Sequence, residues 1–402
     1  MTRLGGAVAD DRGGTRWVTL SKGFYFAFYG AGASLSPFLA LYYQSLGLGG
    51  EQIGLLRAIP SLFTLLVAPL WAGWADASHQ HKRLLLLALS GTLSMAGFMY
   101  LARSFWALVP VVMLYAVFAA PIMSLVDSSV VAMLKGERAR YGRLRLWGAV
   151  GWGIAGPLVG MLVERFTLGW AFYGYWLLIG VGLLLAGLMP IQAARLKTSY
   201  WRGFGQLARN RGWLLFLATM FLFTAGRSTL DGFLFLHLDA IGVPQSLMGI
   251  SLAVASLSEL PIYFWSDRLL ARLGPRRLLL VSMVSTAIML LAVGWMRTPW
   301  LILVIQLLHG PSFSAMWVAS VSMVAEMAPE GMGATAQGIF GSVSMGIGSA
   351  VASLLGGTLF QALGGRLMYT VDAALVIASL AFFAVIARQM HPPAAPGVPA
   401  AS

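Results

Sequence analysis

Apolar stretches long enough to cross a membrane fill almost the whole 402-residue chain. A helix needs about 20 apolar residues to cross a bilayer. Because backbone groups inside lipid must satisfy their own hydrogen bonds, each stretch is expected to be a helix. Twelve spans are predicted: 18–44, 51–74, 83–102, 105–134, 143–164, 167–190, 212–240, 246–272, 276–297, 299–328, 333–362 and 366–390. The sequence therefore predicts an all-α membrane protein with twelve transmembrane helices.

The composition excludes several classes of function. Only 10% of the residues are charged, whereas a soluble domain carries about 25%. The absence of cysteine excludes disulfides and cysteine-based metal sites. The sequence has no GxxxxGK[ST] phosphate-binding loop, no histidine cluster suited to a metal and no soluble stretch long enough for an enzyme. We therefore expect no enzymatic activity, no cofactor and no metal.

The distribution of basic residues predicts the orientation in the membrane. If both termini are cytoplasmic, 21 of the 27 Lys and Arg residues fall in inner loops and tails, and 4 fall in outer loops. This asymmetry follows the positive-inside rule. Topology thus explains the net charge of +13, and a nucleic-acid partner is not needed. We see no removable signal peptide and expect a bacterial cytoplasmic (inner) membrane protein, with the lipid bilayer as a partner.

A polar, basic gap at 191–211 divides the spans into two groups of six. We interpret 18–190 as an N-terminal six-helix bundle and 212–390 as a C-terminal one. The gap is the predicted cytoplasmic linker between them. Residues 1–17 and 391–402 are the predicted cytoplasmic tails.

The two halves resemble each other in sequence. PFLALYYQSLGLGGEQIGLL at 37–56 corresponds to FLFLHLDAIGVPQSLMGISL at 233–252. Two glycines recur at the same offset: Gly47 and Gly54 return as Gly242 and Gly249. A duplicated six-span unit with a binding site between its copies is typical of major facilitator transporters.

Over essentially its whole length, the chain resembles the major facilitator superfamily. GLLRAIPSLFTLLVAPLWAGWAD at 54–76 is similar to the superfamily's loop motif between spans 2 and 3. The resemblance implies two pseudo-symmetric six-helix bundles that work as a monomer on a small-molecule substrate. It also implies that Asp76, with Asp267 as its counterpart in the second half, acts as a gating aspartate.

A closer resemblance is to the branch of lactose, phenylpropionate and nucleoside permeases. It rests on YGRLRLWGAVGWG at 141–153, QLLHGPSF at 306–313 and ATAQGIFGS at 334–342. The sugar permeases of this branch hold sugar hydroxyls with an acid and an arginine that match Asp127 and Arg145. Their stacking aromatic matches Trp152.

The same resemblance covers only some of the residues that couple transport to protons in the sugar permeases. His309 matches the branch's span-10 histidine. Ser312 stands where sugar permeases carry a coupling acid, and Met345 stands where they carry a lysine. Proton coupling, if present, must therefore run through other groups.

Six charged residues lie in or at the edge of the apolar spans: Arg57, Asp127, Arg145, Arg227, Asp231 and Glu259. A charge at the centre of a bilayer costs at least about 2.5–3.5 kcal/mol, so such residues usually face a cavity. For Asp127 and Arg145, one interpretation is a cross-helix pair that opens to bind a polar substrate, because the guanidinium fork can donate two parallel hydrogen bonds. The other is a structural ion pair at the membrane edge.

Three residues of the second half are candidates for proton coupling. Arg227 and Asp231 are four residues apart and share a helix face, so they either neutralise each other or form a protonatable acid with Arg227 as its modulator. Glu259 lies two residues before Pro261, which interrupts the helix, and we expect it to be the leading proton carrier. His309 is either its relay or a hydrogen-bonded core residue.

Two further charges lie near span ends. Arg57 lies about one turn into 51–74 and is expected to extend towards the membrane surface, with a role in substrate attraction or gating as the alternative. Asp372 lies near the outer end of 366–390, where we expect it to contact water.

These observations predict a secondary transporter, driven by the proton gradient, that imports a small polar organic solute. Neutral sugars or nucleosides rank ahead of aromatic carboxylates because the six cavity charges cancel. The first alternative is a proton-driven exporter of drugs or metabolites on the same fold, favoured by GAVGWGIAGPLVG at 148–160. A more remote alternative is a membrane receptor that does not transport.

Overall fold

The computed structural model describes residues 6–134, 139–191, 207, 209–329 and 332–386. These described residues are helical and contain no β-strand. In the N-terminal half the elements are α1 (Gly6–Leu35), η1 (Ser36–Phe38), α2 (Leu39–Ser45), α3 (Gly50–Ser78), α4 (His81–Leu101), α5 (Phe105–Ala119), α6 (Ile122–Met133), α7 (Ala139–Arg165) and α8 (Gly169–Leu188).

The C-terminal half has the same architecture with more interruptions. Its elements are α10 (Arg211–Arg227), α11 (Thr229–Ala240), α12 (Gln245–Phe264), α13 (Ser266–Trp295), α14 (Leu301–Ile305), η2 (Gln306–Leu308), η3 (Gly310–Ser314), α15 (Ala315–Met327), α16 (Gly333–Gly341), η4 (Ser342–Gly348) and α17 (Ser349–Ile386). Two of the interruptions, η3 and η4, are π-helical turns, which often occur at functional sites.

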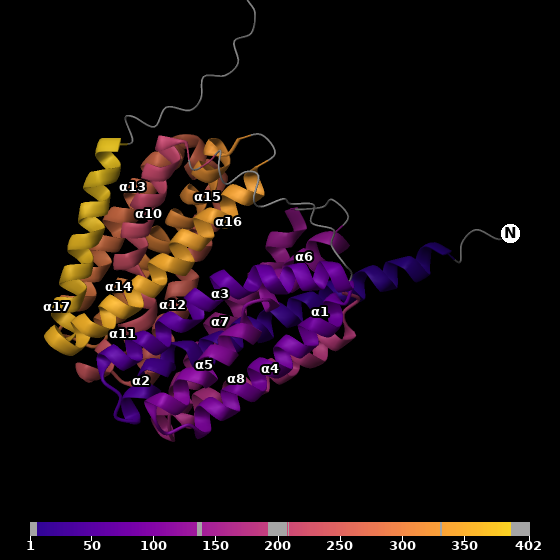
Figure 1. Cartoon of the computed structure of the whole chain (residues 1–402), viewed down its shortest axis with the longest axis horizontal. Helices are drawn as coiled ribbons and strands as arrows, with labels where there is room; N and C mark the ends of the chain where they lie inside the picture. Colours follow the sequence, from indigo (N-terminus) through magenta and orange to yellow (C-terminus); the bar gives the residue numbers. More distant parts are fainter. Residues whose placement is uncertain (1–5, 135–138, 192–206, 208, 330–331, 387–402) are drawn as a thin grey trace, which may run out of the picture.

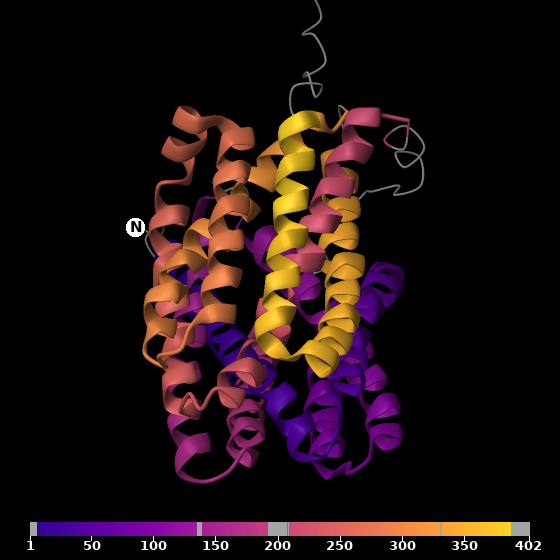
Figure 2. The same cartoon turned by 90° about the vertical axis from the view of Figure 1, so that its left-hand side faces the viewer.

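Eleven helical segments of the described residues are long and apolar enough to cross a membrane. The last of them, Thr335–Ile386, is 52 residues long. A straight helix of that length would measure about 78 Å, whereas the bilayer core is only about 30 Å thick. The chain reverses at Gly364, whose φ is 73°, and Figure 2 shows the two arms of α17 side by side. This segment is therefore two spans, and the predicted total of twelve is confirmed.

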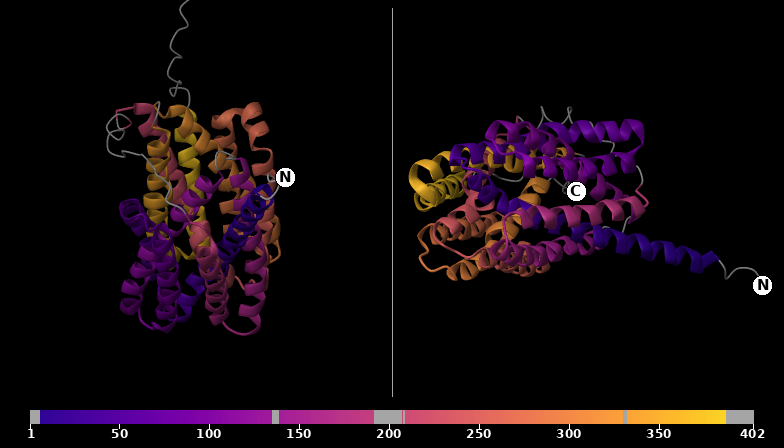
Figure 3. Two further views of the ribbon diagram at one scale, coloured as in Figure 1. Left: turned by 90° about the vertical axis from the view of Figure 1, so that its right-hand side faces the viewer. Right: turned by 90° about the horizontal axis from the view of Figure 1, so that it is seen from below.

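Some helix ends differ from the sequence prediction. Helix α1 begins at Gly6, inside the segment expected to be a tail, and its first turns project beyond the bundle in Figures 1 and 3. A helix can extend past its apolar span because its backbone hydrogen bonds do not depend on apolar side chains. Most of the predicted linker 191–211, and all of the predicted tail 391–402, lie outside the described residues.

The predicted duplication is visible in the positions of the repeated glycines. Gly47 and Gly242 both adopt positive φ, 82° and 78°, in the turns that follow α2 and α11. Gly54 and Gly249 both lie where the halves touch. A Cβ on Gly54 would collide with the carbonyl oxygen of Ser353, and one on Gly249 would lie 2.5 Å from the carbonyl oxygen of Gly156.

The halves meet along two seams, α3 against α17 and α7 against α12. Close backbone contacts in both seams lie near the turns at Gly47 and Gly242. At the opposite end of α3, a Cβ on Gly73 would meet nothing within 4 Å. Figure 1 shows the helix axes of the two halves converging near α2 and α11 and diverging towards α6 and α16. The seams are thus in close contact at one end, here called the closed end, and their helix axes diverge towards the other, here called the open end.

Candidate functional site

The N-half cluster joins α1, α6 and α7 through five polar side chains. Arg145 Nη1 donates to Asp127 Oδ2 at 3.1 Å and to the Tyr141 hydroxyl at 2.8 Å. Arg145 Nη2 donates to the Tyr29 hydroxyl at 3.0 Å. The Tyr25 hydroxyl donates to Asp127 Oδ1 at 2.7 Å. The predicted pairing of Asp127 with Arg145 is therefore confirmed as a contact, and it is extended by three tyrosines.

Local sequence explains why these side chains converge. Tyr25 and Tyr29 are four residues apart on α1, as Tyr141 and Arg145 are on α7, so each pair shares a helix face. Helix α1 can approach α7 closely because Gly148 has no side chain, since a Cβ there would lie 2.5 Å from the Tyr29 ring. The cluster thus depends on close packing of two helices far apart in sequence.

Two side chains of the cluster are partly exposed. The side chain of Arg145 is 46% exposed and that of Asp127 is 24% exposed. An arginine has five N–H donors, of which three are used in the contacts above, and a carboxylate can accept further hydrogen bonds. Donors and acceptors side by side match the two hydroxyls of a diol.

Trp152 lies two turns further along α7 than Arg145, on the same side of the helix. Its ring packs against α1, where a Cβ on Gly32 would lie 3.1 Å from the ring. The side chain is partly buried. Its predicted role as a platform for a sugar ring stays a prediction.

In the C-terminal half, Arg227 and Asp231 form the expected pair. Arg227 Nη1 donates to Asp231 Oδ2 at 2.8 Å. The arginine side chain is only 2% exposed, whereas that of Asp231 is 55% exposed. The Arg227 guanidinium also lies 4.6 Å from the centre of the Phe313 ring, a cation–π contact. Arg227 is thus held by two partners, and Asp231 is the solvent-accessible member of the pair.

Glu259 finds its cross-helix partner in His309. Glu259 Oε1 lies 3.1 Å from His309 Nδ1, although the ring N–H is not aligned for a hydrogen bond. Ser258 connects the same helices, because its hydroxyl accepts from the Gly310 backbone N–H at 2.9 Å. The ring of Phe313 lies 5.6 Å from that of His309. Phe313 therefore contacts both of the charged pairs in this half.

The expected position of Arg57 at the membrane surface is wrong. Its Nη1 donates to the Ser36 carbonyl at 3.1 Å and its Nη2 donates to the Asp231 carbonyl at 3.0 Å. Arg57 follows Gly54 by three residues and therefore shares the helix face that packs in the seam. The guanidinium thus joins the two halves at the closed end, which agrees with the alternative of a gating residue.

Replacement of Arg57 by methionine should lower the free energy of unfolding. A hydrogen bond that involves a charged group contributes about 1.5–3 kcal/mol, and Arg57 makes two. The measurement is thermal unfolding of the purified protein in detergent. Arg297→Met, at an exposed position, is the matched control. An equal shift in both variants would show that the contacts of Arg57 do not join the halves.

The expectation that Asp372 contacts water is also wrong. Asp372 is 3% exposed, and its Oδ2 has no hydrogen-bond partner. It follows Met368 and Tyr369 on the buried face of α17. Distance from a helix end does not reveal which face of the helix a residue occupies, and here the face points into the bundle.

The two predicted gating aspartates lie on opposite halves. Asp267 is exposed in the first turn of α13. Asp76 is part of α3, and its side chain lies outside the described part of the chain. Ser312 is buried and shares a hydrogen bond of 2.7 Å with Thr286, so it has a packing role.

The sequence reasoning missed Tyr25, Tyr29, Tyr141 and Phe313. The spacing of four residues in Tyr25/Tyr29 and Tyr141/Arg145 was an available signal for shared faces. Phe313 gave no such signal, because its contacts come from two other helices.

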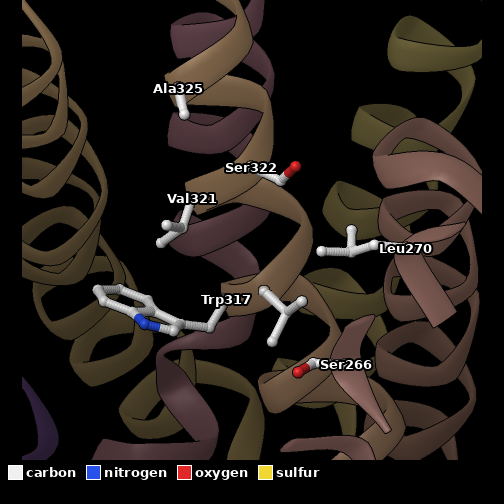
Figure 4. A pocket seen from close by; sticks show the side chains of 7 residues that line it. Ser266, Leu270, Trp317, Val321, Ser322 and Ala325 are labelled. Atoms are coloured by element: carbon white, nitrogen blue, oxygen red, sulfur yellow. The ribbon is translucent and has the colours of Figure 1, made fainter. Parts of the chain in front are cut away.

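An apolar groove of about 340 Å³ opens between the start of α13 and α15. Figure 4 shows Trp317, Val321 and Ala325 along one side and Leu270 on the other, with Ser266 and Ser322 beside them. None of the predicted site residues lines this groove. The polar contacts of the predicted site residues therefore lie outside this groove.

Comparison with known families identifies the fold and its class of function. The profile of the MFS_1 like family matches residues 18–371. The chain belongs to this family. It is therefore a transporter of the major facilitator superfamily and not an enzyme, as the sequence predicted.

Several bacterial proteins are similar to this transporter. The maltose permease of Geobacillus stearothermophilus is 28% identical over 321 residues, which cover 79% of this chain and 81% of the permease. A protein of Escherichia coli (strain K12) described as a probable 3-phenylpropionic acid transporter is 29% identical, with 77% and 82% covered. A multi-drug resistance efflux pump PmrA homolog of Lactococcus lactis subsp. lactis (strain IL1403) is 24% identical, with 79% and 83% covered.

The fold is also shared with solved structures. The crystal structure of the nucleoside transporter NupG superposes with a TM-score of 0.83. The alignment covers 92% of this chain and 99% of NupG at 16% identity. The major facilitator architecture predicted from the sequence is thus confirmed.

Proposed function

We propose that this transporter is a proton-coupled symporter that imports a small, neutral, polar organic solute by alternating access. The observation that carries the proposal is the N-half cluster, an accessible Asp127–Arg145 pair surrounded by three tyrosine hydroxyls. Asp127 and Arg145 bind the hydroxyls of the solute, and Trp152 offers an apolar ring face deeper in α7.

Charge balance supports a neutral solute. Arg145 lies against Asp127, and Arg227 lies against Asp231. Arg57 donates to two backbone carbonyls. Each of the three intramembrane arginines is thus engaged, and a carboxylate solute would have to displace one of these contacts. Sugars and nucleosides therefore fit better than aromatic acids. The name of one relative, a maltose permease, agrees with this preference, whereas another relative is named as a probable 3-phenylpropionic acid transporter.

Proton coupling is assigned to the C-terminal half. Asp231 presents an accessible carboxylate beside the buried Arg227, and Glu259 lies against His309. Carboxylate and histidine side chains inside membrane proteins commonly form proton relays. Arg227 modulates Asp231, while Asp76 and Asp267 belong to the gate. The energy source is the proton gradient, and no cofactor takes part.

The orientation follows from the basic residues. We assign both termini to the cytoplasm, which the positive-inside count supports, and the transporter to the inner membrane of a bacterial cell, which the bacterial relatives support. The turns at Gly47 and Gly242 then face outwards, and the open end of the seams faces the cytoplasm. In this assignment the described conformation is inward-open, and a single chain contains the complete transport path.

The second candidate is a proton-driven exporter. It is favoured by the relative named as a multi-drug resistance efflux pump homolog and by Pro157 in the glycine-rich part of α7. The fold serves both directions, so direction must be measured. A receptor without transport activity is a remote third candidate.

Uptake into proteoliposomes tests the proposal. Labelled maltose, uridine and 3-phenylpropionate are offered with and without an imposed pH gradient, alkaline inside. We expect accumulation of maltose or uridine that depends on the gradient, and loss of that dependence in Glu259→Gln, because the amide cannot carry a proton. Thr358→Ala, at an exposed position of α17, is the control for reconstitution.

Three outcomes would contradict parts of the proposal. Uptake that ignores the gradient would exclude proton coupling. Efflux of an accumulated drug, without uptake of any of the three solutes, would favour the exporter. Accumulation of 3-phenylpropionate alone would overturn the assignment of a neutral solute.

A further inference from the structure

Asp372 is a buried carboxyl group that the proposed transport path does not use. It lies on the second arm of α17, where the backbone of α10 comes so close that a Cβ on Gly226 would lie 2.8 Å from the Asp372 carbonyl oxygen. The side chain is almost completely buried, and its Oδ2 has no hydrogen-bond partner. A charged carboxylate in such a place would be costly unless a cation neutralised it.

The charged and titratable groups of the neighbouring helices are engaged elsewhere. From α3, Arg57 donates to the carbonyls of Ser36 and Asp231. From α10, Arg227 pairs with Asp231. From α11, His237 Nε2 lies 3.1 Å from the Val293 carbonyl. On α17 itself, Arg366 lies 3.7 Å from the centre of the Trp295 ring of α13. Among the described residues, Asp372 therefore has no ion-pair partner.

The hydrogen-bond direction at Thr229 fits a protonated acid. The Thr229 side chain lies beside the Asp372 carboxyl, and its hydroxyl lies 2.9 Å from the Gly226 carbonyl, to which it donates. A hydroxyl has one hydrogen, so while it donates to Gly226 it can offer Asp372 only lone pairs. A carboxylate would face another acceptor there, whereas a carboxylic acid could donate its O–H.

Tyr369 lies three residues before Asp372 on the same helix face, is fully buried, and its hydroxyl has no hydrogen-bond partner. Tyr369 therefore does not donate a hydrogen bond that would stabilise a carboxylate at Asp372.

We propose that Asp372 is a proton-binding site, occupied in this conformation, whose acid O–H faces Thr229. The use of this proton in transport rests on the proposed symport. The binding of the proton to Asp372 does not rest on the symport, and it can be measured without any solute.

Infrared difference spectroscopy of the full-length protein in lipid provides the test. A protonated carboxylic acid has a carbonyl stretch that is absent from a carboxylate and that moves in D2O. We expect such a band at neutral pH in the wild type, its loss in Asp372→Asn, and its retention in Asp239→Asn, an exposed aspartate control. Thr229→Val should shift the band by removing its acceptor.

Several outcomes would overturn the site. They are the absence of the band in the wild type, its persistence in Asp372→Asn, or its disappearance when sodium is added at constant pH, which would indicate a cation site. If Asp372→Asn does not fold, Thr229→Val replaces it as the test. A carbonyl band that has the same frequency in the wild type and in Thr229→Val would then overturn the Asp372 site. If the band behaves as expected but solute uptake does not depend on the pH gradient, Asp372 is a proton-binding site and the proposed symport is wrong.

Discussion

Arg145→Lys is expected to weaken solute binding by about 10- to 100-fold while leaving the protein folded. The guanidinium of Arg145 reaches Asp127, Tyr141 and Tyr29 at once. A lysine ammonium is a point charge that cannot reproduce this planar fork. Loss of one hydrogen bond to a charged group costs about 1.5–3 kcal/mol, and 1.4 kcal/mol corresponds to a tenfold change in affinity. The measurement is the concentration dependence of maltose or uridine uptake in proteoliposomes.

The control for this variant is Arg143→Lys. Arg143 is exposed on the same turn of α7, so the exchange keeps the net charge without altering the cluster. Wild-type affinity in Arg145→Lys would show that the cluster is a structural ion pair at the end of α7. The same loss in both variants would point to a general effect of charge near the membrane surface.

Gly54→Val and Gly249→Val are each expected to open the closed end of the seams. A side chain at Gly54 would collide with the Ser353 carbonyl, and one at Gly249 with the Gly156 carbonyl. Overpacking of this kind costs about 1–3 kcal/mol. Because only the closed arrangement bears this cost, the equilibrium should shift about 10- to 100-fold towards a conformation open at this end.

The absence of native cysteine makes this shift measurable. A single cysteine at Ser256, whose side chain lies 3.7 Å from a Cβ on Gly153 in the α7–α12 seam, is labelled from outside the cell with a membrane-impermeant maleimide. The labelling rate should rise in both valine variants. It should not rise in Gly73→Val, where an added Cβ meets nothing within 4 Å. An unchanged rate in folded Gly54→Val protein would show that the glycine contact is not a gate.

The sequence was a good guide to features that depend on local pattern. Span length and hydropathy predicted twelve helices, since each span must satisfy its own backbone hydrogen bonds in lipid. The matching positions of Gly47 and Gly242 predicted the duplication, because both turns need a positive φ that glycine adopts without strain. The spacing of four residues predicted the Arg227–Asp231 pair, because such residues share a helix face.

Features that depend on which helix faces which were decided by the tertiary structure alone. Arg57 and Asp372 both lie near span ends, and depth in the membrane predicted contact with its surface for each. The packing of α3 against α17 turns Arg57 into the seam, and the packing of α17 against α10 buries Asp372. The sequence by itself thus determined which charges lie in the membrane and how the chain crosses it. Only the folded bundle determined where the side chains of Arg57 and Asp372 lie, because a neighbour on another helix leaves no periodic pattern in the sequence.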